Sequence, residues 1–225
     1  MGYFDRFQTS LSSKVVVALT GLGLVGFVVS HMLANLQVFE GPEAFNTYAT
    51  FLRDLPILLW TARLGLLGVA TLHIGLAIQL ALRNRRARPV AYAVRHYRHA
   101  SWASRTMALT GGLLLLFIVF HLLHLTAGVV DPSFPDRLDA QGHRDIYGKV
   151  VHAFRNPFFV ALYLAGQLVL GLHLSHAVSS SVQTLGLEHA AFNRLLKAAG
   201  PAIALLVVGG NLAIIFAIFL GVVRV

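Results

Sequence analysis

Five stretches without Asp, Glu, Lys or Arg divide the chain into long apolar segments separated by polar connections. They cover residues 15–39, 64–82, 106–130, 157–187 and 198–223. Because a helix needs about 20 apolar residues to cross the hydrocarbon core of a bilayer, each stretch predicts one membrane-crossing helix. We therefore predict an all-α integral membrane protein with one transmembrane domain over residues 1–225. The helices are expected at about 14–38, 57–82, 105–130, 157–183 and 199–223.

Composition supports the membrane class and narrows the chemistry. Charged residues make up 12% of the chain, whereas a soluble domain carries about 25%. The chain has no cysteine, so it cannot hold an iron–sulfur cluster by thiolates or form a disulfide. The first apolar stretch is too long for a signal-peptide core and lacks a small-residue cleavage pattern, so we expect it to be retained as a helix. No low-complexity tract and no convincing repeat is evident.

The basic residues predict an orientation. With five spans, the N-terminal segment and the connections at 83–105 and 188–197 share one side of the membrane. That side carries eleven of the eighteen Lys and Arg residues, seven of them arginines in 83–105. The positive-inside rule then places the N-terminus in the cytoplasm and the C-terminus outside. We interpret the arginine cluster as a topology and lipid-headgroup signal that could also dock an acidic partner, and we reject nucleic-acid binding.

Histidines are the chemically active residues inside the spans. Six of the eleven lie there: His31, His73, His121, His124, His173 and His176. The other five fall in connections or near helix ends and are expected to be surface residues: His96, His99, His143, His152 and His189. One intramembrane histidine could be a hydrogen-bonded packing residue, a member of a proton relay or a metal ligand. The set is more informative, because each of the first four spans carries at least one and the fifth carries none.

Depth along the helices sorts these histidines into two levels. At 1.5 Å per residue, His31 and His121 lie about 25 and 24 Å from the cytoplasmic edge, and His124 about 4 to 5 Å further out. His73 and His173 both lie roughly 15 Å from that edge, and His176 about 10 Å. Two histidines from different helices at one depth can bind the iron of a flat macrocycle from both faces. The pattern therefore favours two haems stacked across the bilayer.

Two other classes stay open beside electron transfer. The pairs "HLLH" and "HLSH" are similar to histidine boxes of membrane di-iron enzymes, but those sites need more histidines at one membrane face. A proton-coupled transporter is expected to carry a buried carboxylate or a broken helix at mid-membrane, and no span contains Asp or Glu. Glycines beside the histidines would let a flat ring approach the helices, although glycine also serves close helix packing.

Three stretches carry a resemblance to a known family: "SSKVVVALTGLGLVGFVVSHMLANLQVF", "EAFNTYATFLRDLP" and "GLHLSHAVSSSVQTLGLEH". They resemble the cytochrome b membrane subunit of succinate dehydrogenase and fumarate reductase, in its single-chain, five-helix, two-haem form. The similarity runs from about residue 9 to the C-terminus. It implies that His31 and His121 bind the distal haem b and that His73 and His173 bind the proximal one. The depths give the same pairs independently. Where some family members carry a glutamate for proton transfer, this chain has Gly171.

The resemblance also implies partners and a reaction. A flavoprotein subunit would oxidise succinate, an iron–sulfur subunit would carry the electrons, and this chain would anchor both in a bacterial cytoplasmic membrane and pass electrons to quinone, with menaquinone expected. Turnover direction and oligomeric state stay open, including a higher oligomer of the complex. The runner-up within electron transfer is the two-haem subunit of another respiratory enzyme, such as nitrate reductase.

A quinone site is expected at one of two places. The outer place comprises the outer ends of the first two helices and their connection, with these polar residues: Asn35, Gln37, Glu40, Glu43, Asn46, Tyr48, Arg53, Asp54 and Arg63. Arg63 could equally bind a haem propionate. The rival place is on the cytoplasmic side and is lined by Ser101, Trp102, Ser104 and Arg105.

Overall fold

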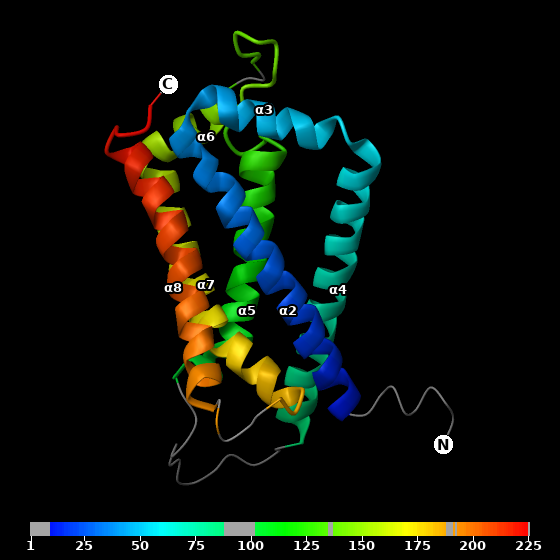
Figure 1. Ribbon diagram of the computed structural model, residues 1–225. Helices are drawn as coiled ribbons and strands as arrows, with labels where there is room; N and C mark the ends of the chain where they lie inside the picture. The colour runs from blue at the N-terminus through cyan, green and yellow to red at the C-terminus, as the bar shows by residue number, and fades with distance from the viewer. Residues whose placement is uncertain (1–9, 88–101, 135–136, 188–190, 192, 225) are drawn as a thin grey trace.

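The predicted helical membrane bundle is confirmed in a computed structural model of the chain (Figure 1). The structure describes residues 10–87, 102–134, 137–187, 191 and 193–224. Within these residues, five helical segments are long and apolar enough to cross a membrane. They are α2 (Ser10–Asn35) with the 3₁₀ turn η1 (Leu36–Glu40), α4 (Pro56–Arg86), α5 (Trp102–His121) with the π-helical turn η2 (Leu122–Thr126), α7 (Pro157–Thr184) and α8 (Asn193–Phe219).

Two further helices occupy connections in which the sequence analysis predicted none. They are α3 (Pro42–Arg53), which follows the first span, and α6 (Ile146–Arg155), which follows the third. Both lie at the end of the bundle that also carries the C-terminus, with α3 running across that end (Figure 1). We call this end the outer end, and the opposite end, where α2 begins, the inner end.

Helix boundaries follow local chemistry. Proline stands at the first turn of α4 and α7, where its missing N–H costs no hydrogen bond. The third span ends at Thr126 rather than near residue 130 because Gly128 adopts a left-handed conformation with φ of 70°. The fifth ends at Phe219 rather than 223, just before Gly221 with φ of 74°. Both glycines occupy a conformation that other residues adopt only with strain.

Helix α8 contains no histidine and packs closely against α7. A β-carbon on Gly200 of α8 would collide with the backbone carbonyl of Ser175 of α7, so the two backbones approach closely. Nearer the outer end, the Asn211 side-chain amide donates a hydrogen bond of 2.9 Å to Oε1 of Gln167. Small residues and interhelical amide bonds are the usual means by which helices associate in lipid. Helix α8 therefore buttresses α7.

Asn46 holds the outer end together. Its side chain in α3 is fully buried, and its amide nitrogen donates to Asp139 at 3.0 Å and to Asp145 at 3.4 Å. Its amide oxygen accepts from the backbone N–H of Tyr147 at 2.9 Å. One residue of the connection after the first span thereby fixes the loop and helix of the connection after the third span. Because its polar atoms already have partners, Asn46 is not available to hydrogen-bond a quinone as the sequence analysis expected.

Replacing Asn46 with leucine should destabilise the outer end without disturbing its volume. The change leaves the Tyr147 N–H buried without its acceptor and deprives two carboxylates of a donor, which should cost about 2 to 4 kcal/mol. Unfolding of the purified protein in detergent would measure the loss. Thr47→Ala, at the exposed neighbouring position, is the control and should change little. Equal stability of the two variants would show that the Asn46 bonds are dispensable.

Candidate functional site

His73 of α4 packs directly on α2. Its Nδ1 lies 3.1 Å from the carbonyl oxygen of Val17 and 3.2 Å from the hydroxyl of Thr20. A β-carbon on Gly21 would come within 3.0 Å of its Cε1. Gly21 is thus the position where the imidazole of α4 rests on the backbone of α2.

His173 of α7 sits on α5 in the same manner. Its Nδ1 lies 3.2 Å from the hydroxyl of Thr110, and a β-carbon on Gly111 would lie 3.5 Å from its Cε1. Thr110 is buried. A threonine–glycine pair therefore supports each of these two histidines from the neighbouring helix.

The hydrogen bonds indicate which ring nitrogen of His73 and of His173 carries the proton and which has none. The hydroxyls of Thr20 and Thr110 donate to carbonyls one turn earlier, at 2.6 Å to Val16 and 3.1 Å to Thr106. Their oxygens are then left to accept, and the Val17 carbonyl can only accept. In both histidines the proton therefore sits on Nδ1, and Nε2 has a free lone pair. A neutral imidazole in this tautomer is a ready metal ligand.

The outer two histidines face each other across the bundle. The ring centroids of His31 in α2 and His121 in α5 lie 6.0 Å apart, with ring planes at 86°. Two opposed imidazoles that each bind one metal ion through a nitrogen at about 2 Å have ring centroids roughly 6 Å apart. The separation of these two rings is close to that distance. Nδ1 of His121 is occupied, at 3.2 Å from the hydroxyl of Tyr163.

The contacts place the four histidines at two levels. His73 rests against Gly21, ten residues before His31 on α2, and His173 rests against Gly111, ten residues before His121 on α5. Ten helical residues correspond to about 15 Å along the axis. The structure thus places His31 and His121 at one level and His73 and His173 at another, and it brings the rings of the outer pair within 6.0 Å.

An internal repeat underlies this arrangement and was missed in the sequence analysis. "ALTGLGLVGFVVSH" of α2 and "ALTGGLLLLFIVFH" of α5 share the A-L-T-G start and the closing histidine at the same spacing. In each copy the Thr-Gly supports a histidine of the next span, while the closing histidine joins the outer pair. In each copy the phenylalanine four residues before that histidine packs on it, at 5.5 Å for Phe27 and 6.2 Å for Phe117. Aligning the spans on their histidines would have revealed the repeat.

The remaining residues expected at a site are spread over both ends. Asn35 ends α2 and is half-buried. Arg63 is exposed on α4, with its guanidinium 5.2 Å from the ring centroid of Trp60. Trp102 and Arg105 are exposed at the start of α5, and Ser101 lies outside the described residues. The structure does not bring the outer and inner sets together.

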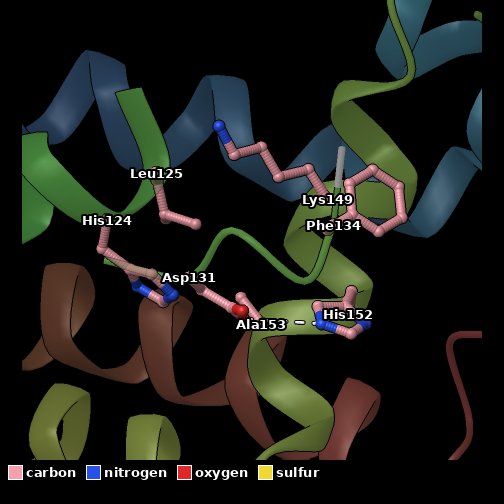
Figure 2. Close-up of a pocket in the computed structure, with 7 residues that line it drawn as sticks. All are labelled: His124, Leu125, Asp131, Phe134, Lys149, His152 and Ala153. Atoms are coloured by element: carbon pink, nitrogen blue, oxygen red, sulfur yellow. Dashed lines mark ion pairs between the residues drawn. The ribbon is translucent and has the colours of Figure 1, made fainter. Parts of the chain in front are cut away.

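A small cavity lies at the outer end, beyond His124. It measures about 10 Å³, near the lower limit for one water molecule. Figure 2 shows His124 and Leu125 entering it from the end of the third span, Asp131 and Phe134 from the following loop, and Lys149, His152 and Ala153 from α6. His152, which was expected to be an ordinary surface residue, lies 3.4 Å from the Asp131 carboxylate.

Asp131 supplies the negative charge at this cavity, which Lys149 also lines. The hydroxyl of Ser133 donates a hydrogen bond to its carboxylate, and together with the backbone N–H of Ser133 and nearby His152 it holds the pKa of Asp131 below its ordinary value. A carboxyl group with a depressed pKa stabilises the fold above its unfolded-state pKa of about 4, and this stabilisation is lost as pH falls through the lower folded value.

Asp131→Asn should therefore lower the melting temperature at pH 7, and its deficit should shrink as pH falls below about 4. The reason is that the native side chain itself loses its charge in that range. Thermal unfolding of both proteins between pH 2 and pH 7 would measure this. Glu43→Gln, at an exposed site on α3, serves as the control. A deficit that stays constant down to pH 2 would show that the charge of Asp131 contributes nothing.

Comparisons with protein-family models, with curated proteins and with solved structures find no match to this chain. The proposed function below therefore rests on the geometry of the histidines and on the local sequence resemblance.

Proposed function

We propose that this chain is the two-haem cytochrome b membrane subunit of a succinate:quinone oxidoreductase. The observation that carries the proposal is the arrangement of four intramembrane imidazoles at two levels about 15 Å apart, with the rings of the outer two 6.0 Å from each other. Three of the four have Nδ1 engaged in a hydrogen bond. The motifs that resemble this family lie on the helices that hold these imidazoles.

Each pair would hold one haem through Nε2 of its histidines. His31 and His121 would be the ligands of the outer haem, and His73 and His173 those of the inner haem. Bound there, haem supplies one-electron transfer between the two faces of the membrane. The chain's own contribution is to orient the imidazoles. Thr20 and Thr110 hold the inner rings by Nδ1, and Gly21 leaves room for the ring of His73.

The inner end would face the cytoplasm and receive the partner subunits. Helix α4 ends there with Arg83, Arg85 and Arg86 in its last turn. Arginines bind carboxylates and backbone oxygens through charge-assisted hydrogen bonds, so this end offers a dock for the iron–sulfur subunit, which in turn carries the flavoprotein. The remaining arginines of the 83–105 connection fall largely outside the described residues. In this assignment the chain takes part in an enzyme whose succinate site lies on a partner, in a bacterial cytoplasmic membrane.

Other readings of the same histidines have less support. A di-iron site needs a compact cluster of ligands, and the described part of the chain contains no group of three or more His, Cys, Asp or Glu placed to hold a metal ion. A transporter would be expected to carry a carboxylate inside a span, which the charge-free stretches lack. The two-haem subunit of a nitrate-reductase-like enzyme remains the alternative within electron transfer. The H-x-x-x-N-L stretch at 31–36 and the Q-T-L-G stretch at 183–186 favour the succinate:quinone family.

We place quinone, with menaquinone as the expected type, at the outer end beside α4. Arg63 and Trp60 are exposed there, together with Ile57 and Leu64. An exposed cation and apolar side chains could hold the carbonyl oxygens and the ring of a quinone. Asn35 ends the helix that carries His31, about one turn further out.

Substitution of the inner ligands should separate the two haems. His73→Ala or His173→Ala should remove one haem and leave the other, because each pair binds independently at its own level. Pyridine-haemochrome quantitation of the purified variants would show half the wild-type haem. His176→Ala, one turn from His173 and without a role as a ligand here, is the matched control and should keep both. Unchanged haem content in His73→Ala would rule out this ligand assignment.

A photoreactive menaquinone analogue should label the outer end. We expect crosslinked peptides within residues 35–63, and Arg63→Leu should reduce the labelling because it removes the proposed hydrogen-bond donor. Lys14→Leu, an exposed cation at the inner end, should leave labelling unchanged. Label confined to the rival inner residues 101–105 would contradict the outer site.

A further inference from the structure

Tyr163 bridges two histidines in the membrane interior. Of the six tyrosines it alone falls within a charge-free stretch, and its side chain in α7 is buried. Its hydroxyl lies 3.2 Å from Nδ1 of His121 and 3.2 Å from Nδ1 of His124. A phenol in hydrocarbon needs a hydrogen-bond partner, and here it has one on either side.

Aromatic packing fixes the tyrosine ring in this place. Its centroid lies 4.8 Å from that of Phe154 with perpendicular planes, 5.4 Å from that of Phe117 and 5.6 Å from that of Phe120. Gly166, one turn along α7, leaves the space that the Phe117 ring occupies. The hydroxyl of Tyr163 is therefore held against the two imidazoles by its neighbours.

His124 is fixed just as firmly. It is buried, and its ring lies 4.1 Å from that of Phe159 and 5.4 Å from that of Phe120. It belongs to the π-helical turn that begins directly after His121. In this turn the backbone N–H of Ala127 donates a 2.8 Å hydrogen bond to the carbonyl of Leu122, five residues earlier. Single π-helical turns are frequent at functional sites. This one brings a second imidazole to the same hydroxyl.

The proposed function determines the direction of these hydrogen bonds. If His121 binds iron through Nε2, its proton must sit on Nδ1, and that N–H donates to the oxygen of Tyr163. The single proton of the phenol is then free to point at Nδ1 of His124, which accepts it. The resulting chain runs from His121 through Tyr163 to His124, whose ring borders the cavity that contains Asp131 (Figure 2).

We propose that Tyr163 and His124 are a positioning pair for the outer haem ligand His121. This inference rests on the proposed function. Donation from Nδ1–H makes an imidazole a more basic ligand and fixes its orientation. For the inner ligands the acceptors are Thr20 and Thr110, whose hydroxyls already donate within their own helices. The outer ligand instead has a tyrosine that a second histidine orients, so the two haems would differ in electronic tuning as well as in depth.

The test is the reduction potential of each haem in Tyr163→Phe, measured by redox titration of the purified protein with any co-purifying subunits. The phenylalanine keeps the ring packing and loses the hydroxyl. We expect both haems to remain bound and the potential of the outer haem alone to rise, because a less basic ligand stabilises ferric iron less. Its low-spin electron paramagnetic resonance signal should shift as well. Thr110→Val is the matched control and should alter only the inner haem.

His124 provides a second test that leaves Tyr163 in place. His124→Leu removes the acceptor and should shift the outer haem in the same direction, whereas His124→Asn offers a side-chain oxygen near the position of Nδ1 and should restore most of the wild-type potential. If both haems bind but neither potential moves in Tyr163→Phe and His124→Leu, the positioning role is wrong and the proposed function stands. Wild-type protein without haem would instead overturn the proposed function itself. If Tyr163→Phe fails to fold, the His124→Leu and His124→Asn pair decides.

Discussion

An imidazole N–H in hydrocarbon needs an acceptor, and the architecture of this bundle follows from meeting that need. Water cannot supply the acceptor, so the protein does: the Val17 carbonyl and the Thr20 hydroxyl for His73, and the Thr110 hydroxyl for His173. Each arrangement brings two helices together, and at His73 the approach is close enough to explain Gly21 beneath the ring. It also leaves Nε2 of these two histidines unprotonated and available to a metal.

The repeat explains how one chain builds two such sites. Helices α2 and α5 carry the same A-L-T-G start and the same closing histidine, and each supports a histidine of the span that follows it. The two copies contribute one histidine each to the outer pair and one supporting face each to the inner pair. Helix α8 carries no histidine and instead buttresses α7 through Gly200 and the Asn211–Gln167 bond. The copies differ at the outer end, where α5 turns into a π-helical segment and Tyr163 lies beside His121.

The sequence predicted the five spans and the grouping of histidines, because both depend on simple lengths: the thickness of hydrocarbon and the rise of a helix. It did not predict α3 or α6, since neither is a long apolar run and both form by packing on the outer end. The sequence predicted a ligand-binding role for Asn46 because this residue is polar and lies in the outer connection. Its burial against Asp139 and Asp145 could not be predicted, because it depends on two connections that are distant in sequence. Tyr163 escaped notice because a single tyrosine in an apolar run has no meaning until α5 and α7 are packed together.

The central claim is that the four histidines exist to hold two haems, and it is tested most directly by haem quantitation and a reduced-minus-oxidised spectrum of the purified wild-type protein with whatever co-purifies. The account predicts two low-spin b-type haems per chain, together with flavin and iron from the partner subunits. A preparation that is folded and monodisperse but contains no haem would contradict it.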